Sequence, residues 1–225
     1  MLCRVQQLGA VEYSEGLRLQ RELVAQRKAG AMPDTLLLLE HRHVYTLGRN
    51  ARKENILLSP EALAEGGAQV FETDRGGDVT YHGPGQLVGY PILDLTQHRR
   101  DIAWYMRSLE DVLIRTAGDF GVRAHRLPGC TGVWVGQEKL AAMGVHLSRW
   151  VTSHGFAFNV NTDLRYFEGI VPCGLRDKGV TSLEKLLGRR VEMDAVVKRI
   201  VEHFGVVFAL EMQIARRDVP VERLS

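Results

Sequence analysis

Cys173 is the residue of this 225-residue chain whose type points most directly to chemistry. It lies in Val171-Pro172-Cys173-Gly174, where proline and glycine offer little bulk to cover a thiol, and the thiolate is the reactive form. A small buried hydrophobic residue is the commoner role of cysteine, so nucleophile and core filler both stay open. Cys3, in an expected strand, and Cys130, after Pro-Gly, are interpreted as structural.

Lys139 is the second candidate, because it precedes a run of small and apolar residues, Leu140-Ala141-Ala142-Met143-Gly144. A lysine at the end of a strand commonly keeps its ammonium group in water. A desolvated lysine can instead accept a proton near neutral pH, and the small residues after it would let a ligand approach the backbone. The sequence leaves both interpretations open.

A glycine-rich segment at residues 75–86 reads Arg-Gly-Gly-Asp-Val-Thr-Tyr-His-Gly-Pro-Gly-Gln. Glycines that cluster in this way mark backbone that bends sharply or comes close to another group. They alternate with polar side chains and lead into a strand-like run. The segment therefore predicts the lining of a binding site.

The histidines do not predict a metal site. His41 and His43 would share one face of a strand, but no third ligand follows at a recognisable spacing. His82 and His154 each precede a glycine, which suits either the wall of a pocket or a hydrogen-bonded core histidine.

Three common signatures of catalysis are missing from the sequence. There is no Gly-x4-Gly-Lys-Ser/Thr phosphate loop, no Gly-x-Gly-x-x-Gly dinucleotide fingerprint between a strand and a helix, and no Gly-x-Ser-x-Gly. These absences argue against nucleotide-dependent chemistry of those types and against a serine hydrolase.

The composition is that of an ordinary globular protein, with 45% hydrophobic and 25% charged residues. A formal charge of +2 does not argue for nucleic acid or membrane as a partner. No apolar run approaches the ~20 residues that span a bilayer, and no secretory signal is visible. Three widely spaced cysteines do not suggest a disulfide framework. We expect a cytoplasmic protein with one domain over residues 1–225.

The spacing of apolar residues predicts the elements that would position these candidates. In the first half we expect a helix over about 11–29 that stops at Gly30 and Pro33, a strand at 36–39 buried on both faces, and a neighbouring strand at 44–47. Strands around 70–71 and 88–93 would enter and leave the glycine-rich segment.

In the second half a long helix begins near Ile102, and strands follow at 132–135, 139–147 and 151–160. Gly136-Gln137 predicts a hairpin between the first two of these strands. Thr181 to Glu184 has capping-box spacing ahead of a short helix, and Val196 to Phe204 form an amphipathic helix. Without a regular βαβ rhythm, an α/β fold of the α+β type is expected, with a mixed sheet flanked by helices.

Four motifs together resemble the lipoyl(octanoyl) transferase family. They are the glycine-rich segment 75–86, Lys-Leu-Ala-Ala-Met-Gly at 139–144, His-Gly-Phe-Ala-Phe-Asn at 154–159 and Pro-Cys-Gly at 172–174. They stand in the family's order, and the resemblance runs from about Leu8 to Leu187. It implies the fold shared by biotin and lipoate protein ligase catalytic domains.

The resemblance also implies roles for residues at matching positions. Cys173 would be the acyl-thioester nucleophile, and Lys139 would lower its pKa or take its proton. Backbone N–H groups near Gly76, Gly77 or Gly144 are candidates to hold the oxyanion. The acyl pocket would be lined by Arg75, Gly76, Gly77, Asp78, Val79, Thr80, Tyr81, His82, Ala142, Met143, Gly144, Gly155, Phe156 and Ala157.

The implied reaction moves an octanoyl or lipoyl group from acyl carrier protein to a lysine of a lipoyl domain, on 2-oxoacid dehydrogenase subunits or the glycine cleavage H protein. No ATP, metal or other cofactor is expected, and the protein is expected to be a monomer. His146 departs from the family pattern, because many members have an arginine there. The departure affects peripheral contacts only.

Two alternatives remain at this stage. An ATP-dependent lipoate or biotin ligase would share the fold, but its adenylate chemistry does not require a cysteine. A non-catalytic module would bind carrier domains without transferring anything. The presence of both Lys139 and Cys173 argues against the module.

Overall fold

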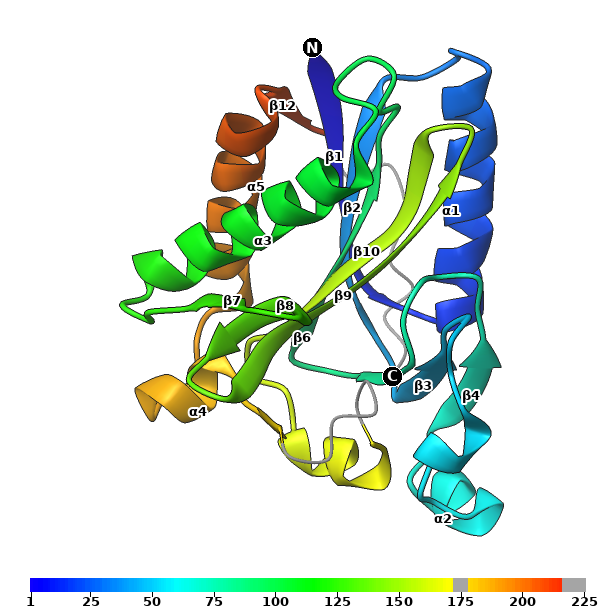
Figure 1. The fold of residues 1–225 in the computed structure, drawn as a ribbon, viewed down its shortest axis with the longest axis vertical. Coiled ribbons are helices and arrows are strands. Elements are labelled where there is room, and N and C mark those ends of the chain that lie inside the picture. The colour runs from blue at the N-terminus through cyan, green and yellow to red at the C-terminus, as the bar shows by residue number, and fades with distance from the viewer. Residues whose placement is uncertain (172–177, 216–225) are drawn as a thin grey trace.

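A large sheet separates two layers of helices in the computed structural model, which describes residues 1–171 and 178–215 (Figure 1). Within these residues the strands form one nine-stranded sheet and one three-stranded sheet. The expected mixed sheet flanked by helices is therefore confirmed. None of the helices described is both long and apolar enough to cross a bilayer.

The large sheet combines parallel and antiparallel pairing. Its order is β12 (Glu211–Ile214), β1 (Leu2–Val11), β2 (Asp34–His41), β6 (Gln86–Ile92), β10 (Val151–Asn159), β9 (Glu138–Ser148), β8 (Cys130–Val135) and β7 (His125–Leu127). The first three strands are parallel, and each later neighbour is antiparallel. The short β11 (Gly179–Val180) pairs in parallel with the start of β9.

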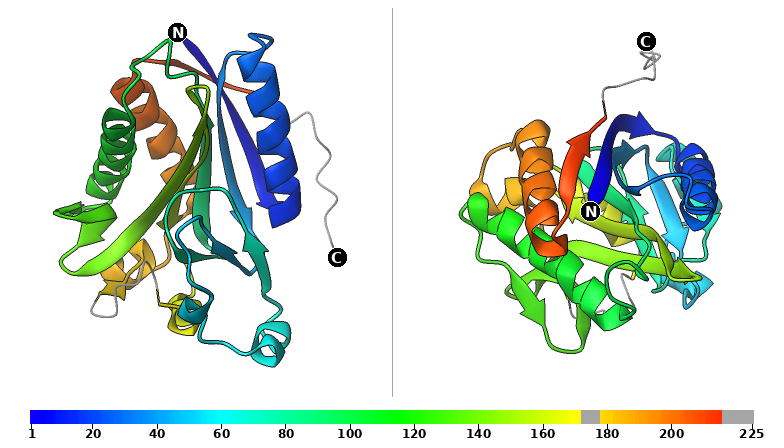
Figure 2. Two further views of the ribbon diagram at one scale, coloured as in Figure 1. Left: turned by 45° about the vertical axis from the view of Figure 1, so that its right-hand side comes forward. Right: turned by 90° about the horizontal axis from the view of Figure 1, so that it is seen from above.

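The helices cover both faces of this sheet. Helix α1 (Tyr13–Lys28) lies on one face, and α3 (Ile102–Asp119) packs with α5 (Met193–Phe208) on the other (Figure 2). Alternate residues of β2 serve the two layers: Leu36 and Leu38 join the core under α3 and α5, and Leu37 and Leu39 join the core on the α1 side. The prediction of a strand buried on both faces is confirmed.

The small sheet has the order β4 (Gln69–Glu72), β3 (Val44–Leu47) and β5 (Val79–His82). Two short segments, η1 (Lys53–Asn55) and α2 (Pro60–Glu65), connect β3 to β4. The expectation that 44–47 neighbours 36–39 in one sheet is wrong. Both edges of β2 are already paired, with β1 and β6, so the chain turns away and β3 pairs with β5 and β4 instead.

The remaining predicted elements of the second half are confirmed, with one correction at α4 (Leu183–Leu187). Gly136 has the positive φ of 58° that the predicted hairpin requires. The cap of α4 is Ser182, whose hydroxyl accepts from the Lys185 backbone N–H at 3.2 Å, and not Thr181. Thr181 still belongs to the extended chain, because its N–H donates to the Lys139 carbonyl at 3.0 Å.

Candidate active site

A narrow cavity lies between the α1-side face of the large sheet and the small sheet. The large sheet contributes small residues from β9 and β10, and the small sheet contributes β5 and the glycine-rich segment before it. The lining residues are Tyr13, Arg75, Gly77, Asp78, Val79, Thr80, His82, Tyr90, Ala142, Met143, Gly144, His154, Gly155, Phe156 and Ala157.

The structure brings together every residue expected in the acyl pocket except Gly76 and Tyr81. Tyr81 turns away, and its hydroxyl lies 2.7 Å from Nδ1 of His43. The Gly76 N–H donates to the Val145 carbonyl at 2.9 Å, so this group is already hydrogen-bonded in the structure. Tyr13 and Tyr90 were missed, because their meeting at this cavity depends on long-range packing that no local motif carries.

Arg75 forms the buried polar wall of the cavity. Its guanidinium donates to the Thr46 carbonyl at 2.7 Å and to the Gly76 carbonyl at 3.1 Å. The side chain also packs closely on Gly144, where an added Cβ would lie 3.1 Å from Arg75 Cδ and 2.6 Å from the Gly76 carbonyl oxygen. The glycine at 144 is therefore required by the close approach of the Arg75–Gly76 backbone to β9.

We expect Gly144→Ala to destabilise the protein by about 1–3 kcal/mol, because the new methyl group would collide with backbone and not with a side chain that can move. Thermal or urea unfolding measures the change. Gly118→Ala in α3 is the matched control, since nothing lies within 4 Å of its added Cβ and alanine favours a helix. Equal stability of the two variants would contradict the close packing at Gly144.

Three histidines near the cavity each have at least one ring nitrogen in a hydrogen bond. Nδ1 of His82 lies 2.8 Å from Gln86 Oε1, and His41 bridges the Val11 carbonyl at 2.8 Å and the Tyr90 hydroxyl at 2.7 Å. Nε2 of His154 lies 2.7 Å from an Asp74 carboxylate oxygen. Burial lowers the pKa of His41 to about 4 and that of His82 to about 3, so both rings are neutral at pH 7.

These lowered pKa values predict a loss of stability in acid. In the unfolded chain His41 and His82 become protonated below their ordinary pKa of 6.5. In the folded chain they become protonated only near pH 4 and pH 3, respectively. The contribution of the two neutral histidines to the free energy of unfolding is thus fully present above pH 6.5 and falls as the pH is lowered below that value. Each histidine contributes a slope of about 1.4 kcal/mol per pH unit within its window.

The measurement is urea unfolding between pH 7 and pH 4. We expect His82→Gln to flatten the slope by roughly the contribution of one proton. His125→Gln, at an exposed position of β7, should leave the slope unchanged. A slope that is the same in His82→Gln and in the unaltered chain would show that His82 is not held neutral by its burial.

Lys139 lies at the start of β9, and its side chain is only 7% exposed. It lines a second small cavity together with Thr80, Gln86, Ala142, Ala157, Asn159, Phe167 and Val180. Thr80, Ala142 and Ala157 also line the narrow cavity, so the two cavities lie side by side with these residues in common. Lys139 therefore lies in the cavity next to the one under the glycine-rich segment.

A series of hydrogen bonds connects the two cavities from His82 towards Lys139. Gln86 Oε1 is hydrogen-bonded to Nδ1 of His82, and Gln86 Nε2 donates to Asn159 Oδ1 at 2.9 Å. Asn159 in turn donates from Nδ2 to the Thr181 carbonyl at 3.0 Å. Because the Thr181 N–H is bonded to the Lys139 carbonyl, these buried amides fix β5, β6, β10 and the β11 segment relative to one another.

Cys173 lies outside the described residues, as do its neighbours 172–177. The described residues on both sides of it are firmly placed. The Val171 N–H donates to the Asn55 carbonyl at 2.8 Å, and β11 pairs Val180 with Lys139. The chain therefore passes directly beside Lys139 seven positions after the cysteine.

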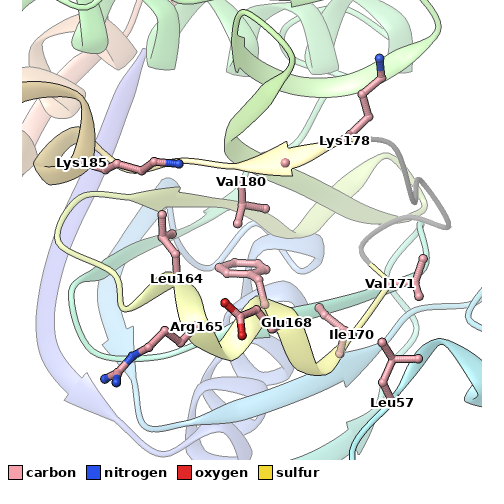
Figure 3. A pocket seen from close by; sticks show the side chains of 11 residues that line it. Leu57, Leu164, Arg165, Glu168, Ile170, Val171, Lys178, Val180 and Lys185 are labelled. Carbon is pink, nitrogen blue, oxygen red and sulfur yellow. The ribbon is translucent and has the colours of Figure 1, made fainter.

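An open cavity of about 680 Å³ adjoins this region. It shares Phe167 and Val180 with the cavity around Lys139. Figure 3 shows Val180 and Leu164 projecting into it from one side, and Ile170, Val171 and Leu57 from the other. The three cavities thus lie in a row: the open cavity, lined by apolar and charged residues, then the cavity around Lys139, then the narrow cavity under the glycine-rich segment.

Comparison with known proteins decides the family. Residues 12–205 match the model of the lipoyl protein ligase A/B catalytic domain. The octanoyltransferase of Solibacter usitatus is 57% identical over 93% of this chain and 94% of its own length, and that of Caldicellulosiruptor saccharolyticus is 51% identical over 94% and 91%. The chain belongs to the octanoyltransferase family.

Solved structures place this octanoyltransferase-family enzyme in the expected fold. Lipoate-protein ligase A bound with ATP superposes with a TM-score of 0.76 at 16% identity, covering 96% of this chain and 90% of the other. Biotin protein ligase from Aquifex aeolicus superposes with a TM-score of 0.55 at 13% identity, covering 93% and 70%. At these identities the likeness shows the fold alone, and the fold implied by the sequence motifs is confirmed.

Proposed function

We propose that this protein transfers an octanoyl or lipoyl group from acyl carrier protein to a specific lysine of a lipoyl domain, through a thioester on Cys173. The observation that carries the proposal is the row of three adjacent cavities, in which the cavity around Lys139 shares lining residues with the open cavity on one side and the narrow cavity on the other. Relatives with the name octanoyltransferase support the acyl group and the reaction class. The two held ends of the segment support a place for Cys173 beside Lys139.

In the first half-reaction the Cys173 thiolate attacks the carbonyl carbon of the donor thioester. A new C–S bond to Cys173 forms, the C–S bond to the phosphopantetheine arm breaks, and the departing thiolate takes up the proton of the Lys139 ammonium group, which leaves Lys139 neutral. The exchange joins similar bonds and is close to thermoneutral. Lys139 as an ammonium group would favour the Cys173 thiolate by its positive charge.

In the second half-reaction the lysine amine of the lipoyl domain attacks the acyl-Cys173 carbonyl. An amide C–N bond forms, the C–S bond to Cys173 breaks, and one proton leaves the amine. A free lysine with a pKa near 10.4 is mostly protonated at pH 7 and must give one proton to solvent before it attacks. Lys139, left as a neutral amine after the first half-reaction, would accept the second proton as the amide forms. Two bulky protein partners can thus visit one site in turn.

The narrow cavity would hold the acyl chain. Small residues on β9 and β10, Ala142, Gly144, Gly155 and Ala157, let the chain lie against the sheet. The backbone N–H group of Gly77 remains the proposed donor to the oxyanion, since the Gly76 N–H is already bonded and Gly144 pairs with Gly155 in the β9–β10 ladder. Asp78 would help to position the glycine-rich segment and would not act on the substrate, because its carboxylate accepts a hydrogen bond from the Asn55 side-chain amide at 2.6 Å.

The donor thioester is already activated, so the proposed reaction needs neither ATP nor a metal or other cofactor. The proposed acceptors are the lipoyl domains of 2-oxoacid dehydrogenase subunits and the glycine cleavage H protein, with the enzyme a cytoplasmic monomer. Among the described residues no group of three or more histidine, cysteine or acidic side chains is placed to hold a metal ion.

The experiment that tests the proposal compares two acyl donors. With octanoyl-acyl carrier protein and no ATP, an unmodified lipoyl domain should gain an octanoyl group. With free octanoate and ATP it should gain none. The reverse pattern would identify an ATP-dependent ligase, and binding of both carriers with no transfer from either donor would identify a non-catalytic module.

A further inference from the structure

Trp134 packs directly against Lys139. Its indole is fully buried in β8, and the Lys139 Nζ lies 4.8 Å from the ring centroid. A cation at this distance over a ring face is attracted by the negative charge of the π system, most strongly for tryptophan. The contact does not depend on the acyl pocket residues.

A β-bulge creates the contact. Val133 pairs with Ala141, but the next residue of β8, Trp134, pairs with Lys139, so Leu140 is an extra residue in β9. In a regular strand Lys139 and Ala142 would point to opposite faces, because side chains alternate. With the bulge both line the same small cavity, and Lys139 lies across from Trp134.

Gly132 lies beside both side chains. Its φ is +125°, and an added Cβ would collide with the Ala141 carbonyl oxygen at 2.6 Å and would touch Lys139 Cε at 3.5 Å and Trp134 Nε1 at 3.6 Å. The methylene stem of Lys139 and the indole therefore meet at this glycine. The bulge, Gly132 and the Trp134 ring together determine the direction of the Lys139 side chain.

Simple packing does not account for an indole here. Trp134 Nε1 is buried and has no hydrogen-bond acceptor within the part of the chain that is described. An unpaired buried donor costs free energy, and a phenylalanine or leucine would fill the space without one. The contact between the ring face and the Lys139 Nζ explains why residue 134 is a tryptophan, which the volume of the side chain alone does not explain.

Charged side chains near Lys139 have contacts of their own among the described residues. Glu138, next to Lys139, binds the Lys185 ammonium at 2.7 Å, and Lys178 contacts Gln137. His82 is bonded to Gln86. The other side chains that line the cavity around Lys139, in the described residues, are neutral.

We propose that Trp134 is a positioning residue, which holds the Lys139 ammonium group over its ring and towards the cavity and so favours the Cys173 thiolate. The inference rests on the proposed Cys173–Lys139 pair and deepens it. Without the ring, the ammonium group would lose both an attractive contact and its fixed direction. The thiolate would then form at higher pH.

The test is the pH at which Cys173 reaches half of its maximal rate of alkylation by iodoacetamide, in chains that carry Cys130→Ser to remove the partly exposed Cys130 thiol. Trp134→Leu should raise this midpoint by up to about one pH unit, and Trp134→Phe, which keeps a weaker ring, by less. Both variants are also made together with Lys139→Ala. In that background neither should shift the midpoint further.

The outcomes separate the two ideas. If Lys139→Ala itself leaves the midpoint unchanged, the proposed pair fails and the role of Trp134 fails with it. If Lys139→Ala shifts the midpoint, but the tryptophan variants do nothing or shift it equally in both backgrounds, only the role of Trp134 is overturned. Thermal unfolding establishes that each variant is folded. If Trp134→Leu does not fold, the result for Trp134→Phe decides the role of Trp134.

Discussion

Cys173→Ser is expected to lower octanoyl transfer to a lipoyl domain by roughly 10³-fold or more. A few per cent of a cysteine is thiolate at pH 7, whereas a serine hydroxyl is not ionised and needs a strong base to attack a carbonyl. A discontinuous assay by mass spectrometry of the lipoyl domain measures the rate. The proposed covalent intermediate makes this the largest single effect in the account.

Cys130→Ser is the matched control for that experiment. Cys130 is the first residue of β8 and is partly exposed. The Cys130→Ser enzyme should transfer the octanoyl group at the normal rate. Cys3 is not a rival nucleophile, because burial raises the pKa of its thiol to about 12. Normal transfer by Cys173→Ser would remove the cysteine from the mechanism.

Lys139→Ala is expected to act twice. The pH midpoint of Cys173 alkylation should rise by about one to three units, since a nearby cation lowers a thiol pKa by that much. Transfer should also fall by about 10²- to 10⁴-fold, because the incoming amine loses its proton acceptor. Alkylation profiles and transfer rates, measured on one preparation, give both numbers.

Lys198→Ala provides the comparison, because it removes a lysine of the same charge from an exposed position of α5. Its alkylation midpoint and its transfer rate should match those of the unaltered chain. If Lys139→Ala gave that same unchanged profile with normal transfer, Lys139 would be a strand-end lysine and nothing more.

Most of the main framework could be predicted from the sequence. The helix that became α1 and the strand that became β2 carry local signals, a 3.6-residue period and a short apolar run, and both predictions were confirmed. The placement of β3 was wrong because partner choice depends on which sheet edges are already occupied. No local pattern records that.

The candidate site was predictable to the extent that its residues cluster in motifs. Residues of the glycine-rich segment and Ala142 to Gly144 do line one cavity, but Tyr13 and Tyr90 reach it only through the packing of α1 and β6. The β8–β9 bulge that turns Lys139 towards the cavity leaves no mark in the sequence, and neither does the two-residue β11 that runs beside it.

The central claim is the acyl-enzyme, and intact mass spectrometry tests it most directly. The protein is incubated with octanoyl-acyl carrier protein without ATP and without a lipoyl domain. We expect one octanoyl adduct, which maps to the peptide with Cys173, is absent from Cys173→Ser, and disappears when a lipoyl domain is added. Steady transfer to the lipoyl domain with no adduct at Cys173 would contradict it.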